Sequence, residues 1–81
     1  AFDQFREIMR RECARRNVPF DESGLAYLLH EYYIKPGNPL RACHARDLQD
    51  EILDMARYKN VPPTLSTEMI DRACKSYFVP L

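Results

Sequence analysis

The feature that most constrains this chain is the alternation of helix-patterned segments with breaks that contain proline. Apolar residues recur at three- and four-residue steps, the spacing that places side chains on one face of an α-helix. Proline disfavours helical backbone at the residue before it and has no N–H to donate, so each break ends a helix. No segment alternates apolar and polar residues as a strand does. The pattern predicts an all-α fold.

Four helices joined by short loops are expected. The first covers about residues 2–17 and ends at an Asn-Val-Pro break; the second covers about residues 22–34, with Asp21 as its cap. A loop rich in proline and glycine follows, and the third helix then extends from residue 43 or 44 to about residue 59. Ser66 or Thr64 caps the last helix. These segments predict a four-helix bundle.

One apolar stripe on each helix is expected to contribute to a common core. The chain has 81 residues, 46% of them hydrophobic and 30% charged, which allows one compact domain, residues 1–81, rather than a disordered chain. Tyr33 is expected at the rim of the core. The expected core residues are Phe2, Phe5, Ile8, Met9, Cys13, Leu25, Leu28, Leu29, Tyr32, Leu48, Ile52, Met55, Ala56, Met69, Ile70, Ala73, Cys74 and Tyr77.

Charges on the first helix favour a solvated face over a nucleic-acid stripe. Five arginines are interleaved with three acids, several of them three or four residues from an arginine, the spacing at which side chains pair on a helix. The whole chain carries 12 basic and 12 acidic side chains and a formal net charge of zero. We therefore expect the cations of this helix to pair with its own carboxylates.

Cysteine and histidine are too sparse and too scattered for a zinc site, a disulfide framework or a thiol enzyme. Cys13, Cys43 and Cys74 are far apart in sequence, and of the possible ligands only Cys43 and His44 are adjacent. We expect small buried thiols and no metal, and a reducing cytoplasm as the location. No apolar run approaches the roughly 18 residues that a membrane helix requires, so no membrane partner is expected.

One stretch, residues 35–46, holds three cations and no acid. It contains Lys35, Arg41 and Arg46 and leads into the amino end of the third helix. A helix amino end carries unpaired N–H groups and partial positive charge, so a cation is disfavoured there and an anion is attracted. Two interpretations remain open: an ordinary pair of Arg46 with Asp47, or an arginine that projects toward a phosphate.

The order of segments resembles the small carboxy-terminal lid domain of AAA+ ATPases over about residues 5–78. The similarity lies in the series NVPFD, LAYLLHEYY, a Pro/Gly loop, PLRACHARDLQDEIL and LSTEMIDRAC. In that family the third lid helix typically begins with the sensor 2 motif, an arginine followed two residues later by an apolar core residue. Arg46 and Leu48 match this pattern.

The resemblance implies a lid that covers a nucleotide held by an upstream P-loop domain. Arg46 would contact the terminal phosphate of ATP or ADP bound with Mg²⁺ in the full-length protein; Arg41 would be a weaker phosphate contact or meet a neighbouring subunit, and His44 would lie near the adenine. The partners implied are that P-loop domain and the adjacent subunits of a homo-oligomeric ring. No GxxxxGK[ST] loop is present. The chain would thus be a piece of a longer protein, monomeric alone, without tightly bound nucleotide or catalytic residues of its own.

Two alternatives stay open at this stage. The five tyrosines suit a helical protein-interaction module without a nucleotide role. A small DNA-binding domain would place the third helix in the major groove, but that helix carries four acids, and no direct nucleic-acid contact is expected. The tail, residues 78–81, either packs on the bundle or extends from it.

Overall fold

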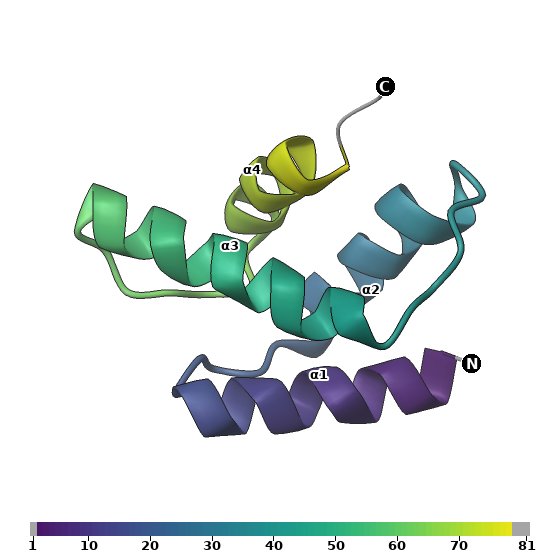
Figure 1. The fold of residues 1–81 in the computed structure, drawn as a ribbon, viewed down its shortest axis with the longest axis horizontal. Helices are drawn as coiled ribbons and strands as arrows, with labels where there is room; N and C mark the ends of the chain where they lie inside the picture. Colours follow the sequence, from purple (N-terminus) through teal and green to yellow (C-terminus); the bar gives the residue numbers. More distant parts are fainter. Residues whose placement is uncertain (1, 79–81) are drawn as a thin grey trace.

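The computed structural model describes residues 2–78, which form four α-helices (Figure 1). They are α1 (Phe2–Arg16), α2 (Glu22–Leu29), α3 (Cys43–Lys59) and α4 (Thr67–Tyr77), and α2 continues into a π-helical turn, η1 (His30–Ile34). No strand occurs within residues 2–78. The predicted all-α fold with four helices is confirmed.

Side-chain caps fix the starts of α2 and α4. The Asp21 carboxylate accepts hydrogen bonds from the backbone N–H groups of Ser23 (3.0 Å) and Gly24 (3.3 Å). The Ser66 hydroxyl oxygen accepts one from the Met69 N–H (3.2 Å). Each cap satisfies N–H groups that have no partner inside the helix. Ser66 is therefore the cap of α4, and the alternative, Thr64, is excluded by this bond.

The same tripeptide, Asn-Val-Pro, ends both α1 and α3. Asn17 and Asn60 adopt left-handed backbone, with φ of 59° and 58°. The N–H of the following valine then reaches back to a carbonyl five residues earlier, at 2.9 Å for Val18 and 3.0 Å for Val61. Asparagine tolerates this conformation better than most residues, and proline cannot continue the helix. The two breaks expected from the sequence are thus built alike.

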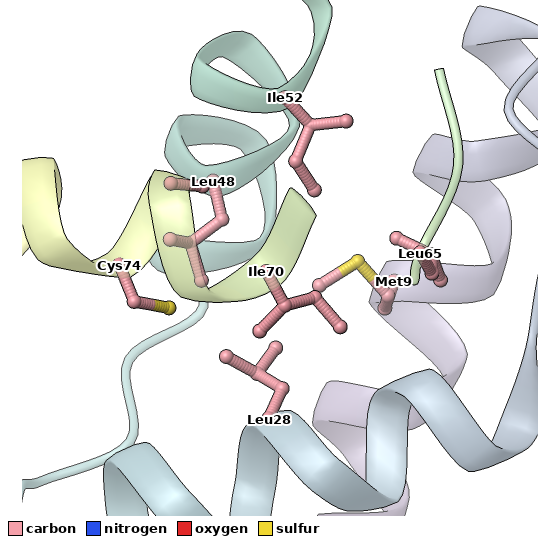
Figure 2. Close-up of a pocket in the computed structure, with 8 residues that line it drawn as sticks. Met9, Leu28, Leu48, Ile52, Leu65, Ile70 and Cys74 are labelled. Carbon is pink, nitrogen blue, oxygen red and sulfur yellow. The ribbon is translucent and has the colours of Figure 1, made fainter. Parts of the chain in front are cut away.

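The core lies where the four helices meet the segment before α4. Met9, Leu28, Leu48 and Ile70, one from each helix, point toward one another and toward Leu65 (Figure 2). The cavity between them measures only about 10 Å³, so it holds at most one water. The buried hydrophobic residues are Phe5, Met9, Cys13, Val18, Leu25, Leu28, Tyr33, Ala45, Leu48, Ile52, Ala56, Leu65, Met69, Ile70, Ala73 and Cys74.

Most of the expected core is confirmed, and two tyrosines exchange places. Tyr33, expected at the rim, is 2% exposed, whereas Tyr32 is only half-buried. An α-helix would place Tyr32, four residues after Leu28, on the buried stripe. The π-helical turn instead closes with a bond from the Lys35 N–H to the His30 carbonyl, five residues apart (3.0 Å). The added residue per turn moves the buried position from 32 to 33.

Other differences fall at the margins of the core. Phe2, at the first position of α1, is 44% exposed, and Ile8, Leu29, Met55 and Tyr77 are half-buried. Phe78 packs back on the bundle, with its ring 5.6 Å from the ring of Tyr33. The rest of the tail, residues 79–81, lies outside the described residues.

Candidate functional site

An open groove runs between α1 and the amino end of α3, and we call it the α1–α3 groove. It consists of two adjoining hollows of about 110 and 290 Å³ that share Ile8 and Ala42. Arg41 lines the smaller hollow and Arg46 the larger. In Figure 1 the loop after η1 descends to this edge and leads into α3 beside α1. The remaining lining residues are Gln4, Phe5, Glu12, Leu40 and Cys43.

The guanidinium group of Arg46 is exposed and only loosely paired. Its side chain is 64% exposed on the first turn of α3, and its Nε lies 4.0 Å from an oxygen of Asp47. The other carboxylate oxygen of Asp47 accepts a hydrogen bond from the Tyr77 hydroxyl at 2.8 Å. Because α4 holds Asp47 in this way, the carboxylate is only in part available to Arg46. The arginine is thus neither buried nor locked to an internal carboxylate.

Glu12 also lines the hollow that Arg46 occupies, but other arginines hold it. Its carboxylate pairs with Arg15 at 2.8 Å and with Arg16 at 3.3 Å. Arg15, followed by Arg16 and Arg46, keeps the pKa of Glu12 below its ordinary value. Glu12 therefore stays ionised at neutral pH, and its charge is compensated by α1 itself. Within residues 2–78, Arg46 therefore has only the loose pair with Asp47 and a weaker, longer-range attraction to Glu12.

The amino end of α3 differs from those of α2 and α4. Its preceding residue, Ala42, has no side chain that accepts a hydrogen bond, and its first turn contains no acid. Its first N–H bonds are turn-like, from His44 to the Arg41 carbonyl (3.1 Å) and from Ala45 to that of Ala42 (3.3 Å). The positive end of the helix dipole and Arg46 are thus on the same side of the groove.

His44 lies away from the groove, in an aromatic cluster. Its Nδ1 is hydrogen-bonded to the Tyr33 hydroxyl at 2.8 Å, and the edge of its ring meets Tyr77 at a centroid distance of 5.4 Å. Burial, and then the charge of Arg41, lower its pKa from the ordinary value. Burial also raises the pKa of Tyr33. His44 is therefore neutral at pH 7 and positions the start of α3 against η1 and α4.

Of the three predicted site residues, the structure brings two to one groove. Arg41 and Arg46 share the α1–α3 groove, and His44 is held in the aromatic cluster. The cations of α1 are paired as expected: Arg10 and Arg11 with Glu7, and Arg15 with Glu12. Two further pairs, which the sequence did not indicate, join α1 to other helices: Arg6 to Glu22 and Arg16 to Asp50.

A second hollow, of about 560 Å³, lies between the carboxyl half of α3 and α4, and we call it the α3–α4 groove. The groove was not predicted from the sequence, because its lining comes from α3 and α4, whose lining residues are distant from each other in the chain. One signal was present: Tyr58 is an aromatic residue off the apolar stripe of α3, and it is 91% exposed. The lining residues are Asp54, Met55, Tyr58, Lys59, Arg72 and Lys75.

Residues 2–78 contain no cluster of three or more His, Cys, Asp or Glu side chains arranged to hold a metal ion. None of the helices in this range is long and apolar enough to cross a membrane. The core cavity, at about 10 Å³, is too small for any ligand larger than a water molecule, so we sought binding sites among the open grooves.

The fold and its surface define a small all-α domain with an arginine-lined groove at the start of its third helix. The chain belongs to the family described as Domain of unknown function (DUF8689), whose family profile matches residues 1–76. No curated protein and no solved structure matches the chain.

Proposed function

We propose that this domain is the lid of an AAA+ ATPase, in which it covers a nucleotide bound to an upstream P-loop domain. The observation that carries the proposal is Arg46, an exposed arginine with a loose partner on the first turn of α3. In the resembled family this is the place of the sensor 2 arginine. Leu48, two residues later, is 2% exposed, as the apolar residue of that motif requires.

The chemistry of the α1–α3 groove fits the end of a triphosphate. A guanidinium group offers paired N–H donors and a permanent charge, which suit phosphate oxygens. The amino end of α3, which has no side-chain cap, adds the partial positive charge of the helix dipole. When ATP binds, Arg46 would stabilise negative charge on the terminal phosphate, and Arg41 would add a second cation at the groove edge. The groove is open and shallow, so the rest of the nucleotide must be held by another domain.

Mg²⁺ is assigned in this proposal to the upstream domain. The two cations of the groove would repel a metal ion, and the one acid that lines it, Glu12, is already paired with arginines. Bound Mg²⁺ would neutralise phosphate charge in the full-length protein. In this proposal the chain adds the positive charge of Arg46 on the side of the phosphate that faces away from the P-loop domain. Loss of the terminal phosphate would then change the angle between the lid and the P-loop domain.

Arg46→Ala in the full-length protein tests the proposal. We expect ATP turnover to fall on the order of 10²-fold, the size usual for loss of one stabilising donor. Affinity for ATP should fall more than affinity for ADP, because Arg46 is placed to contact the terminal phosphate. The measurements are steady-state ATP hydrolysis and titration with fluorescent ATP and ADP analogues.

Arg11→Ala is the matched control, since Arg11 is an exposed arginine, 75% accessible, outside the groove. It should leave turnover and both affinities unchanged. Arg46→Lys should recover only part of the lost turnover, because lysine keeps the charge and loses the paired donors. Unaltered turnover and nucleotide affinity in Arg46→Ala would exclude this role for Arg46 and leave the lid function without its main support.

A further inference from the structure

We infer that the α3–α4 groove is a docking site for an acidic peptide segment that carries one apolar side chain. The groove is separate from the α1–α3 groove and uses none of its residues. α3 and α4 pack against each other (Figure 1), and the hollow is lined by residues of both helices. The inference does not rest on the proposed lid function.

The floor of the groove suits an apolar side chain. Met55 is half-buried there, and its flexible thioether adapts to varied apolar partners. Tyr58 stands at the edge with 91% of its surface exposed, although a tyrosine ring gains by losing contact with water. Tyrosine and arginine, both present in the lining, are among the residue types enriched at the residues that dominate protein interfaces. A volume of about 560 Å³ accommodates a few side chains.

Charge at the groove is positive in a chain whose formal net charge is zero. The lining holds three cations, Lys59, Arg72 and Lys75, and one acid, Asp54. Asp54 is itself shared with Arg57 at 3.8 Å. Opposite charge across an interface steers association and suppresses unsuited partners. The occupant that complements this lining is therefore acidic.

The cations are only weakly satisfied by the domain. Glu68 lies between two of them, with its Oε1 at 3.9 Å from Lys59 and 3.8 Å from Arg72, which are long for ion pairs. Among residues 2–78, Lys75 has no carboxylate within ion-pair distance, although its charge helps to lower the pKa of Asp71, four residues earlier on α4. The carboxylate of Glu68 thus pairs only loosely with Lys59 and Arg72. A carboxylate of a bound peptide could form an ion pair with Lys75.

A peptide fits these features better than a nucleic acid does. Sites for single-stranded nucleic acid combine several aromatic platforms with a cationic path that follows the backbone. Here one aromatic residue stands alone, and Asp54 and Glu68 interrupt any such path. Carboxylates spaced along a peptide can pass between these acids, whereas a continuous row of phosphates cannot.

A peptide array probed with the labelled 81-residue protein tests the inference. One set of degenerate octapeptides carries a central Phe, Leu, Tyr or Trp flanked by Asp and Glu. A second set replaces the acids by Asn and Gln, and a third keeps the acids and replaces the central residue by Ala. We expect the protein to be retained on the first set only. In an NMR titration with the best peptide, the chemical-shift changes should be confined to the carboxyl half of α3 and to α4.

Variants locate the site. Tyr58→Ala and Lys75→Glu should each weaken binding of the best acidic peptide by at least about tenfold. Both side chains are exposed, so the fold should persist. Arg11→Glu, a charge reversal of the same size on α1, should change the affinity less than about twofold, as expected for a charge outside the interface.

Several outcomes would overturn the inference. Equal retention on the acidic and neutral sets would remove the charge argument, and binding unchanged by both groove variants would place the site elsewhere. Tighter binding of a ten-residue oligothymidine, with the same sensitivity to Tyr58→Ala, would assign the groove to nucleic acid. Concentration-dependent shifts of the groove residues without peptide would assign it to a second copy of the chain. None of these outcomes would bear on Arg46 or on ATP turnover.

Discussion

Two regions of the domain differ in how closely their atoms are packed. One is the contact between α2 and the segment before α4, and the other is the α1–α3 groove. At the first, a Cβ added to Gly24 would lie 2.0 Å from the carbonyl oxygen of Leu65. At the second, Arg46 is 64% exposed and touches its neighbours loosely. The first region has no room for one more carbon, and the second leaves a charged group free to meet a ligand. Residues that hold the fold and residues available for function are therefore separable in this domain.

Gly24→Ala should have the largest effect on stability. The clash involves backbone, so α2 or the segment around Leu65 must shift, and the cost should reach or exceed about 3 kcal/mol, the upper part of the usual overpacking range. A domain this small has a stability of only about 5–15 kcal/mol. Urea denaturation followed by circular dichroism measures the loss.

Gly37→Ala is the matched control, since the chain has two glycines. A Cβ at Gly37 would meet nothing within 4 Å, but its φ of +73° is left-handed. The cost should be about 1–2 kcal/mol, from the backbone alone. Equal losses in the two variants would show that the close approach at Gly24 is relieved cheaply and would weaken the comparison.

Gln49→Met should stabilise the domain. Gln49 is fully buried, and its amide nitrogen donates to the sulfur atoms of Met9 (3.1 Å) and Cys13 (3.0 Å). Its Oε1 has no hydrogen-bond partner among residues 2–78. A buried polar group without a partner costs about 1–3 kcal/mol, and methionine has a similar length and volume. We expect a gain near the lower end of that range, about 1 kcal/mol, measured by urea denaturation.

Gln49→Glu provides the opposite test of the same site. A carboxylate there would face two sulfur atoms, of which only the Cys13 thiol is a donor, and a weak one. Burial should raise its pKa in the folded state, so the variant should lose stability as the pH rises from the unfolded-state pKa of about 4.3 to that raised value. A destabilised Gln49→Met would mean that the amide makes a contact worth more than its burial costs.

Local sequence predicted the helices and their ends because these depend on neighbours in the chain. Burial depends instead on which other segments pack against a residue. The two Asn-Val-Pro breaks show the difference between local sequence and tertiary packing. Their backbones match, yet Val18 is 3% exposed and Val61 is 45% exposed. The valines are alike in local sequence, and only the tertiary surroundings distinguish them. This is why helix ends were predicted well and the margins of the core less well.

The candidate site was predictable to the same extent. The exposed position of Arg46 follows from its place at a helix start outside the apolar stripe. The surroundings of His44 do not follow, because Tyr33 and Tyr77 come from other helices and because a π-helical turn moved Tyr33 inward. The α3–α4 groove escaped prediction for the same reason, as α4 supplies Arg72 and Lys75.

The aromatic cluster should make stability depend on pH through His44. Its pKa in the folded state lies below the value of about 6.5 expected when unfolded. The unfolded chain therefore binds the proton first, so stability is full above about pH 6.5 and falls as the pH drops toward the folded-state pKa. Urea denaturation at pH 7.5, 6.5 and 5.5 should show this fall, and His44→Gln should remove it.

Four carboxylates whose pKa values are lowered in the folded state act in a lower pH range than His44. Hydrogen bonds from Tyr32 and Tyr27 lower the pKa of Asp71, and the pairs with arginine lower those of Glu7, Glu12 and Glu22. These groups lose their contributions only as the pH falls below about 4.5. The same decline in the wild type and in His44→Gln between pH 7.5 and 5.5 would contradict the assignment.

The smallest expected effect on stability belongs to the residue with the largest proposed role. Arg46→Ala removes an exposed side chain whose nearest carboxylate is 4.0 Å away, so the free energy of unfolding should change by less than about 0.5 kcal/mol. Arg16→Ala is the comparison, since Arg16 is only 14% exposed and pairs with Glu12 and Asp50; it should lose about 1 kcal/mol. Urea denaturation of the two variants tests the contrast.

A loss for Arg46→Ala as large as that for Arg16→Ala would mean that Arg46 stabilises the fold. The exposure of Arg46 would then no longer support a ligand contact. A negligible change in the free energy of unfolding would show that Arg46 does not stabilise the fold. A cation at the amino end of a helix is disfavoured unless an anion lies near it, so this result would favour a role for Arg46 in anion binding.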